Sequence, residues 1–138
     1  MLTKEAHGIR CALGFQFAES ASSLIQSFVN SSPTRLGGTH LDGFLLGLTE
    51  ALNKDSSQRR PFKPHELRTG LFAVVGVWLS APQYGGATKD ELINTEVETF
   101  VRELALEGVG HWLADPERNA EWVVQFLDEQ RRRVEGAD

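Results

Sequence analysis

The chain has 138 residues, of which 41% are hydrophobic and 24% charged, and its formal net charge is −5. This length and composition indicate one globular domain, expected to span residues 1–138, and they exclude a disordered chain. The single cysteine, Cys11, excludes a disulfide framework, and the acidic charge argues against a free-standing protein that neutralises nucleic-acid phosphates. No apolar run approaches the roughly 20 residues that span a bilayer, and residues 1–10 do not resemble a signal peptide, so we expect a cytoplasmic location.

Two segments near the N-terminus have the alternation of β-strands. In residues 8–17, apolar side chains alternate with polar or small ones, which predicts a half-buried strand. Residues 24–30 alternate in the same way after the turn residues 19–22. We therefore predict that the two strands form an antiparallel hairpin.

A helix is predicted from Thr39 onward. Thr39 is a good N-cap residue, and Asp42 lies three positions later, where a short acidic side chain can accept a hydrogen bond from the backbone N–H of the cap residue. Apolar side chains then recur at the spacing of one face of an amphipathic helix of about fifteen residues: Leu41, Phe44, Leu45, Leu48 and Leu52. Residues 54–61 form a polar loop, after which Pro64 can open a short helix that ends at Gly70.

The second half of the chain begins with a strongly apolar segment, residues 71–79. This segment is rich in Val, Leu, Phe and Trp on both faces, which predicts a central strand buried on both sides. A loop over residues 82–89 follows. Thr95 and Glu98 then form the capping box of a second long helix.

The C-terminal part predicts two helices with a break between them. Gly108 and Gly110 each weaken a helix interior by about 1 kcal/mol relative to alanine, so we expect the second helix to kink or break there. The Asp-Pro-Glu sequence at residues 115–117 then starts a third helix, whose apolar stripe is Ala120, Val123, Val124 and Leu127. The arginines at residues 131–133 are expected to be exposed in its last turn, where cations suit the helix dipole.

The predicted element order is strand, strand, helix, short helix, strand, helix, helix. This order predicts an α+β fold in which the helices pack on one face of a single sheet. No internal repeat or linker interrupts it. We expect one domain with a core over about residues 8–114 and an exit helix over about 116–134.

Few residues fall in patterns that carry chemistry. The sequence has no Gly-rich phosphate loop, GxSxG or HExxH motif, and its histidines lack the spacing of metal ligands, so we expect no metal site. The histidines are interpreted as surface or capping residues: His7, His40, His65 and His111. Cys11 is interpreted as a buried, inert thiol. The arginine run at 131–133 is interpreted as a solvated helix end, with nucleic-acid contact as the alternative.

Several phrases of the sequence resemble a known protein family. The first is SPTRLGGTHLDGF at residues 32–44, and the second is LRTGLFAVVGVWL at residues 67–79. ATKDEL at residues 87–92 and TEV at residues 95–97 follow. In this order and at this spacing, the phrases resemble the transducer domain of the DNA gyrase B and topoisomerase IV B subunits. The resemblance extends over about residues 8–133.

This resemblance implies a fold and a role. The fold is that of the second domain of ribosomal protein S5: a two-layer α+β sandwich with a left-handed βαβ crossover, an exception to the usual handedness, and a long C-terminal exit helix. In this family the domain lies between an ATP-binding domain and the DNA-cleavage core. It couples ATP binding and hydrolysis to DNA strand passage in a type IIA topoisomerase.

The resemblance also implies site residues in the loop before the second long helix. The family's Gln-Thr-Lys motif matches Ala87, Thr88 and Lys89, so Thr88 and Lys89 are the expected ATP-contacting residues. Lys89 is the expected catalytic residue, because a lysine ammonium suits the charge that develops on the γ-phosphate. Alanine at position 87 cannot hydrogen-bond a phosphate, so half of the motif's polar contacts are missing. The alternative for Lys89 is an ordinary loop lysine.

The family's other motifs are absent from this sequence. Its ATP and Mg²⁺ site lies in a preceding domain and its DNA-cleavage site in a following one, so ATP would be bound mainly by a neighbouring domain. We expect this chain alone to be an inactive monomer. The expected partners are the ATPase and cleavage domains of the same enzyme or a gyrase A-type subunit, with DNA bound only in the whole enzyme. The alternative, favoured by Ala87, is a stand-alone, non-catalytic binding module, acting as a gyrase partner or antagonist.

Overall fold

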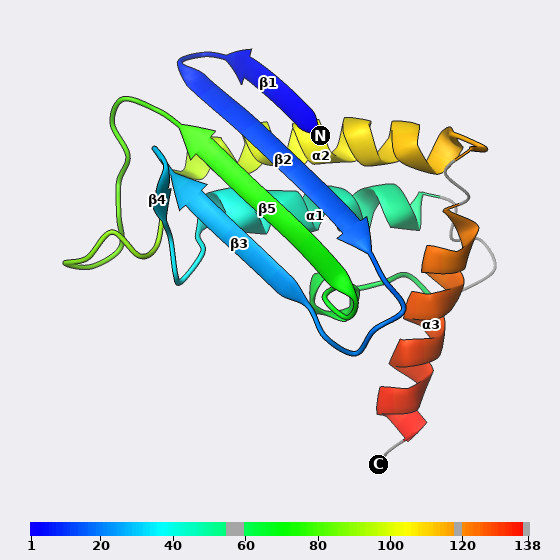
Figure 1. The fold of residues 1–138 in the computed structure, drawn as a ribbon. Coiled ribbons are helices and arrows are strands. Elements are labelled where there is room, and N and C mark those ends of the chain that lie inside the picture. The colour runs from blue at the N-terminus through cyan, green and yellow to red at the C-terminus, as the bar shows by residue number, and fades with distance from the viewer. Residues whose placement is uncertain (55–59, 118–119, 137–138) are drawn as a thin grey trace.

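The computed structural model describes residues 1–54, 60–117 and 120–136. One five-stranded sheet has the order β1-β2-β5-β3-β4, with the bounds Leu2–Ala6 (β1), Ile9–Phe17 (β2), Leu24–Val29 (β3), Ser32–Pro33 (β4) and Leu71–Trp78 (β5). The helices are α1 (Thr39–Asn53), the short 3-10 helix η1 (Pro64–Leu67), α2 (Thr95–Ala114) and α3 (Glu121–Gly136). α1 and α2 lie side by side behind the sheet, and α3 runs away from the end of α2 (Figure 1). This two-layer arrangement confirms the predicted α+β fold.

The order of the strands corrects the predicted hairpin. β2 and β3 are not neighbours, because β5 lies between them, antiparallel to β2 and parallel to β3. Alternation of apolar residues identifies the buried face of a strand, but it does not identify the strand's neighbour. The chain passes from β3 to β5 through α1 behind the sheet, which is the left-handed crossover expected of this fold (Figure 1).

The core lies between the sheet and the two long helices. Four of the five residues of the predicted α1 stripe are buried, each at most 5% exposed: Phe44, Leu45, Leu48 and Leu52. The fifth, Leu41, is half-buried and packs against the same core. The four face the buried inward side chains of β2 and β5, which are Ile9, Cys11, Leu13, Phe17, Leu71, Ala73, Val75 and Val77. Cys11 is completely buried, as predicted, and burial raises the pKa of its thiol to about 12, which disfavours the reactive thiolate.

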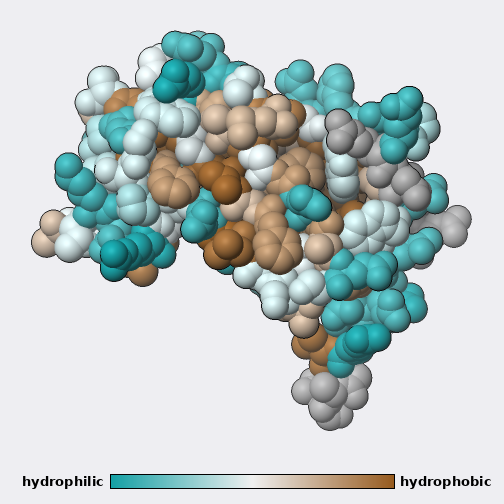
Figure 2. All heavy atoms as spheres, in the orientation of Figure 1, coloured by the Kyte–Doolittle hydropathy of each residue, from teal (hydrophilic) through white to brown (hydrophobic). Residues whose placement is uncertain are grey.

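The outer face of the sheet is open, so the prediction that residues 71–79 are buried on both sides is wrong. Phe72 and Val74 of β5 are 37% and 46% exposed, and Leu24 of the adjacent β3 is 55% exposed. Figure 2 shows apolar side chains gathered over the strands on this face. β5 is central within the sheet, but the helices cover only one of its faces, and its apolar composition does not reveal that difference.

Two glycines allow α1 and α2 to pack closely. A β-carbon at Gly43 would lie 2.4 Å from the carbonyl oxygen of Glu98, and one at Gly47 would lie 2.5 Å from that of Arg102. Neither distance is sterically possible, so this helix spacing requires both glycines. Arg102 Nη1 also donates to Glu50 Oε1 across the helix pair at 3.0 Å. The close approach accounts for the Gly-Phe pair of the first sequence phrase.

α2 is one continuous helix, so the break predicted at Gly108 and Gly110 is wrong. Gly108 faces β1, a strand that the sequence analysis did not predict. A β-carbon at Gly108 would lie 2.2 Å from Leu2 Cδ1 of that strand. The glycine therefore makes room for β1, and its cost to the helix is offset by this packing.

The helices also begin at different residues from those predicted. The N-cap residues of α1 and α2 are Gly38 and Asn94, one position before Thr39 and Thr95, and neither accepts a side-chain capping hydrogen bond from a backbone N–H of its helix. The backbone N–H of Thr39 instead donates to a carbonyl oxygen of the loop before α2. Tertiary contacts have replaced the local capping chemistry that the sequence patterns suggested.

α3 begins later than predicted, and part of its surface differs from the prediction. Asp115 ends α2 instead of starting α3, which spans Glu121–Gly136 and not about 116–134. The predicted stripe is confirmed as packed, with Val124 half-buried and the others buried: Ala120, Val123 and Leu127. Arg131, predicted to be exposed, is only 7% exposed, whereas the two arginines after it are exposed as predicted.

Candidate functional site

The predicted site residues lie in the loop between β5 and α2. Thr88 and Lys89 are both exposed, in the part of the loop that follows Gly86. Thr88 Oγ1 donates a hydrogen bond to Asp90 Oδ2 at 2.7 Å. The Lys89 ammonium is therefore presented to solvent, whereas the Thr88 hydroxyl has a partner within the loop.

The base of this loop is fixed to the N-terminus of α1 by backbone hydrogen bonds. Leu92 N donates to Gly37 O at 3.2 Å, and Thr39 N donates to Leu92 O at 2.9 Å. Leu36 N donates to Asp90 O at 2.8 Å. Lys89 thus stands on a loop whose outgoing limb is held by the segment immediately before α1.

The two limbs of the loop are also joined to each other. Ile93 N donates to Gln83 O at 2.9 Å, and Gln83 N donates to the Asn94 side-chain oxygen at 2.6 Å. Gly85 N donates to Glu91 O at 3.0 Å. The exposed segment that carries Lys89 is therefore short and anchored at both ends.

Gly38 is the residue that permits this anchoring. Its φ of 136° lies in the region that favours glycine, and a β-carbon there would lie 2.4 Å from the Leu92 carbonyl oxygen. The Gly-Gly of the first sequence phrase thus serves to bring the loop backbone against the start of α1.

A buried polar network supports the same end of α1. His40 is fully buried, and its Nε2 lies 3.0 Å from Thr34 Oγ1, which in turn lies 2.7 Å from Ser27 Oγ of β3. Burial lowers the pKa of His40 to about 4, so the ring is neutral near pH 7. The interpretation of His40 as a surface or capping residue is therefore wrong.

The sequence carried one clue to this network. Ser27 occupies an inward-facing position of β3 between Ile25 and Val29, where a polar side chain needs a buried partner. The identity of that partner depends on how the turn after β4 folds back, which periodicity does not show. Two further atoms near it, Thr39 Oγ1 and His40 Nδ1, are buried without a hydrogen-bond partner among the described residues.

The surroundings of the loop base are acidic. The pKa of Asp42, in the first turn of α1, is raised first by desolvation and then by the charges of Glu98 and Glu91, against a smaller opposite effect of Arg68. An anion approaching the loop would therefore meet the Lys89 cation at its exposed part and carboxylates at its base.

A ligand such as ATP can be tested against these residues. The exposed Lys89 ammonium fits a terminal phosphate, and Ala87 offers it only a methyl group. Among the described residues, no group of three or more His, Cys, Asp or Glu side chains could hold a metal ion. The loop can thus supply one cationic contact to a nucleotide phosphate.

Comparisons with known proteins agree on one family. A sequence model described as DNA gyrase B matches residues 2–137. The DNA gyrase B subunit of Archaeoglobus fulgidus is 36% identical over 131 residues, which are 91% of this chain and 21% of the relative. The B subunit of Mycobacterium tuberculosis H37Rv gyrase is 35% identical over 124 residues, covering 85% and 18% of the two chains. The chain thus spans about a fifth of the length of these relatives.

Solved structures show the same likeness. The 43K ATPase domain of Thermus thermophilus gyrase B, in complex with an aminocoumarin, has a TM-score of 0.86 and 28% identity, covering 99% of this chain and 38% of that one. The topoisomerase IV ATP-binding domain of Francisella tularensis has a TM-score of 0.81 and 25% identity, covering 96% and 39%. Within the part of the chain that the structure describes, no helix is long and apolar enough to cross a membrane.

Proposed function

The chain belongs to the DNA gyrase B family, and from this premise we propose that it acts as the transducer domain of a type IIA DNA topoisomerase. In this role it couples ATP binding and hydrolysis in a neighbouring domain to DNA strand passage. The observation that carries the proposal is the exposed Lys89 on a loop anchored to the start of α1. A loop of this kind can sense a ligand outside the domain and transfer force to a helix inside it.

Lys89 has the proposed catalytic role. Its ammonium contacts the γ-phosphate of ATP bound by the neighbouring domain, where charge develops during hydrolysis. Thr88 is the second proposed contact to the phosphate, and its hydroxyl must then break its hydrogen bond to Asp90. The nucleotide and its Mg²⁺ are held mainly by the other domain, so the isolated chain hydrolyses no ATP.

The proposed partners follow from the same role. They are the ATPase domain and the cleavage domain of the same enzyme, or a gyrase A-type subunit. DNA is bound only by the whole enzyme, because this chain is acidic, with a net charge of −5. We propose that the enzyme is cytoplasmic and that the isolated chain is monomeric.

The test requires an intact gyrase B protein in which residues 2–137 of this chain replace the matching segment. Lys89→Ala should slow steady-state ATP turnover by about tenfold or more and leave nucleotide binding largely unchanged, because a charge directed at the transition state is removed. Lys54→Ala, at an exposed lysine after the other end of α1, is the matched control and should turn over ATP like the parent. Equal turnover of Lys89→Ala and the parent would refute the sensing role.

Ala87 favours a second function. The family's motif has glutamine there, so a domain that no longer senses nucleotide would act as a non-catalytic binding module, a partner or antagonist of gyrase. The DNA that flanks the coding segment distinguishes the two functions. ATPase and cleavage domains encoded in frame on either side would exclude the stand-alone module.

A further inference from the structure

Arg131 is a buried arginine on the docked face of α3. It follows Val123 and Leu127 at four-residue intervals, so all three side chains lie on one stripe of the helix. The Arg131 side chain is 5% exposed, whereas those of its neighbours Arg132 and Arg133 are 76% and 70% exposed. The stripe that attaches α3 to the domain therefore ends in a cation.

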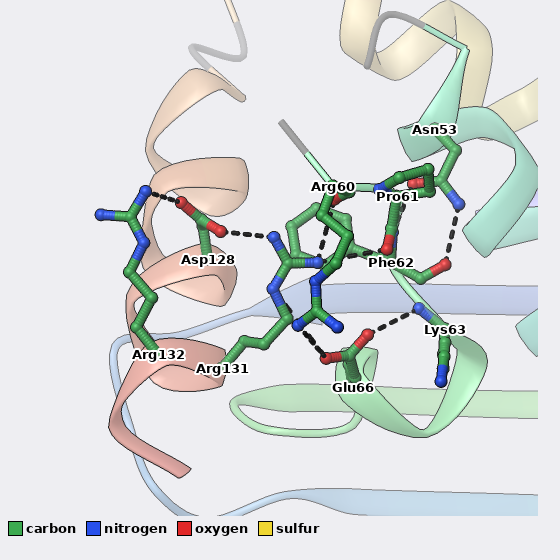
Figure 3. Close-up of polar contacts among 9 residues, drawn as sticks. All are labelled: Asn53, Arg60, Pro61, Phe62, Lys63, Glu66, Asp128, Arg131 and Arg132. Atoms are coloured by element: carbon green, nitrogen blue, oxygen red, sulfur yellow. Dashed lines mark hydrogen bonds and ion pairs between the residues drawn. The ribbon is translucent and has the colours of Figure 1, made fainter. Parts of the chain in front are cut away.

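Arg131 binds the segment that joins α1 to η1. Its Nη1 donates to the carbonyl oxygens of Arg60 and Pro61 at 3.0 and 3.2 Å, and its guanidinium lies 4.6 Å from the centre of the Phe62 ring (Figure 3). Its Nε lies 3.9 Å from Glu66 Oε2 of η1. A buried guanidinium is stable only when its donors are matched in this way.

A further contact holds the guanidinium from the side of α3. Arg131 Nη2 donates to Asp128 Oδ1 at 2.5 Å, and Arg132 Nη2 binds the other oxygen of the same carboxylate at 2.9 Å (Figure 3). Glu66 is in turn fixed by the Lys63 backbone N–H, which donates to its Oε1 at 2.8 Å. We call the contacts of Arg131 with residues 60–66 the Arg131 latch.

The bound segment is also fastened to the end of α1. Asn53, the last residue of α1, donates from Nδ2 to Phe62 O at 2.9 Å and accepts from Phe62 N through Oδ1 at 2.8 Å (Figure 3). Phe62 itself is 3% exposed. One helix, α1, thus carries the anchor of the Lys89 loop at its start and the partner of the Arg131 latch at its end.

Crevices flank α3 along much of its length. One of about 400 Å³ lies between α3 and residues 19–21, and another of about 270 Å³ lies between α3 and the η1 region. The helix therefore contacts the domain through its buried stripe and the half-buried side chains beside it, which are Trp122, Val124 and Phe126. Removing one buried contact from the end of that stripe should weaken the docking of the helix.

We propose that the Arg131 latch couples the position of α1 to the docking of α3, so that a displacement of the Lys89 loop reaches α3 through α1, Asn53 and Arg131. The sensing part of this proposal rests on the proposed transducer function. The latch itself does not, since it consists of contacts within this chain. Arg131 is in these terms a positioning residue for α3, with no contact to nucleotide.

The latch can be tested by hydrogen–deuterium exchange of the 138-residue chain without nucleotide. Arg131→Met keeps an apolar stem but loses the guanidinium, and it should accelerate exchange of the α3 amides by about tenfold while β2 and β5 change by less than about twofold. Asn53→Ala, which lies outside α3, should accelerate the same α3 amides. Arg133→Met is the matched control, because the Arg133 side chain is 70% exposed and pairs with Glu129 instead of Asp128. Its α3 amides should exchange like the parent's.

Other outcomes would overturn the proposal. Unchanged α3 exchange in Arg131→Met would show that there is no latch, and unchanged α3 exchange in Asn53→Ala would show that α1 is not linked to it. If Arg131→Met does not fold, Arg131→Lys replaces it, because lysine keeps the charge but cannot reach both backbone carbonyls and the carboxylates together. α3 exchange equal to the parent's in that variant would equally refute the latch.

Transmission from the loop is tested with Gly38→Ala, which pushes Leu92 away from α1. Gly38→Ala should accelerate α3 exchange by about threefold or more in the parent, and this effect should vanish in the Arg131→Met background. An equal acceleration in both backgrounds would mean general destabilisation and would refute transmission. The exchange result of Gly38→Ala could contradict transmission while Lys89→Ala still slows ATP turnover. That combination would overturn the route through α1, Asn53 and Arg131 but leave the proposed function standing.

Discussion

The backbone of Leu92 lies directly against the α-carbon of Gly38, where a β-carbon would come within 2.5 Å of the Leu92 nitrogen and 2.4 Å of its carbonyl oxygen. The two residues also form an isolated parallel bridge. This contact connects the loop that carries Lys89 to α1, one of the two long helices that pack against the sheet. The relation between Gly38 and Leu92 therefore governs both the stability of the domain and the position of its candidate site.

Gly38→Ala should destabilise the domain by about 2–4 kcal/mol, since strain at a positive φ adds to a clash with backbone atoms that cannot move independently. Gly86→Ala is the matched control: its φ is also positive, at 102°, but nothing lies within 4 Å of the added β-carbon. It should cost only the strain, about 1–2 kcal/mol. Urea unfolding of the three chains measures the difference, and equal losses for both variants would show that the Leu92 contact is unimportant.

The stability of the domain should fall as the pH falls from about 6.5 to about 4, through His40. In the folded state burial lowers the pKa of His40 from 6.5 to about 4. Between these two pH values the His40 ring is therefore protonated in the unfolded chain but neutral in the folded chain, which favours unfolding. The stabilisation is complete above pH 6.5 and decreases by about 3 kcal/mol on acidification to pH 4.

The contribution of His40 to this pH dependence is isolated by a variant. His40→Gln removes the titrating ring, so the free energy of unfolding should depend less steeply on pH between 4 and 6.5 than in the parent. A slope that His40→Gln leaves unchanged would show that the ring is accessible to protons in the folded state.

Periodicity predicted the faces of the elements well, because burial of apolar surface dominates their placement. The α1 stripe from Phe44 to Leu52 and the alternation of β2 are both confirmed. The neighbours of the strands could not be predicted in the same way. β5 separates β2 from β3 because the chain crosses behind the sheet, and no local pattern encodes that crossing.

The remaining misses concern residues whose role depends on a distant partner. The sequence alone indicates a helix break at Gly108, whereas in the structure this glycine makes room for β1. Arg131 was predicted to be exposed to solvent, but it lies four residues after Leu127 and therefore on the buried stripe of α3. The resemblance located the loop of Lys89, but its anchoring by Gly38 and its support by His40 required the three-dimensional structure.

Leu127→Ala should destabilise the domain by about 2–4 kcal/mol, because the side chain is completely buried under α3 and its removal leaves a cavity. Val134→Ala, at a residue of the same helix that is 73% exposed, should change stability by less than about 0.5 kcal/mol. Thermal unfolding of the two variants and the parent makes the comparison. A melting temperature of Leu127→Ala equal to that of the parent would show that α3 is undocked in solution.

Ala87→Gln should raise ATP turnover in the intact gyrase B protein that carries this domain. Position 87 is exposed and lies two residues before Lys89. A glutamine there is therefore expected to reach the phosphate that Lys89 is proposed to contact and to add a hydrogen bond worth about 1 kcal/mol, or a few-fold in rate. The gain should depend on the lysine, because the amide alone supplies no charge. Steady-state ATP turnover of four proteins forms a double-mutant cycle that measures this dependence: the parent, Ala87→Gln, Lys89→Ala and the double variant. A gain of the same size with and without Lys89 would indicate an indirect effect of position 87, and no gain in either background would indicate that the loop does not reach the nucleotide.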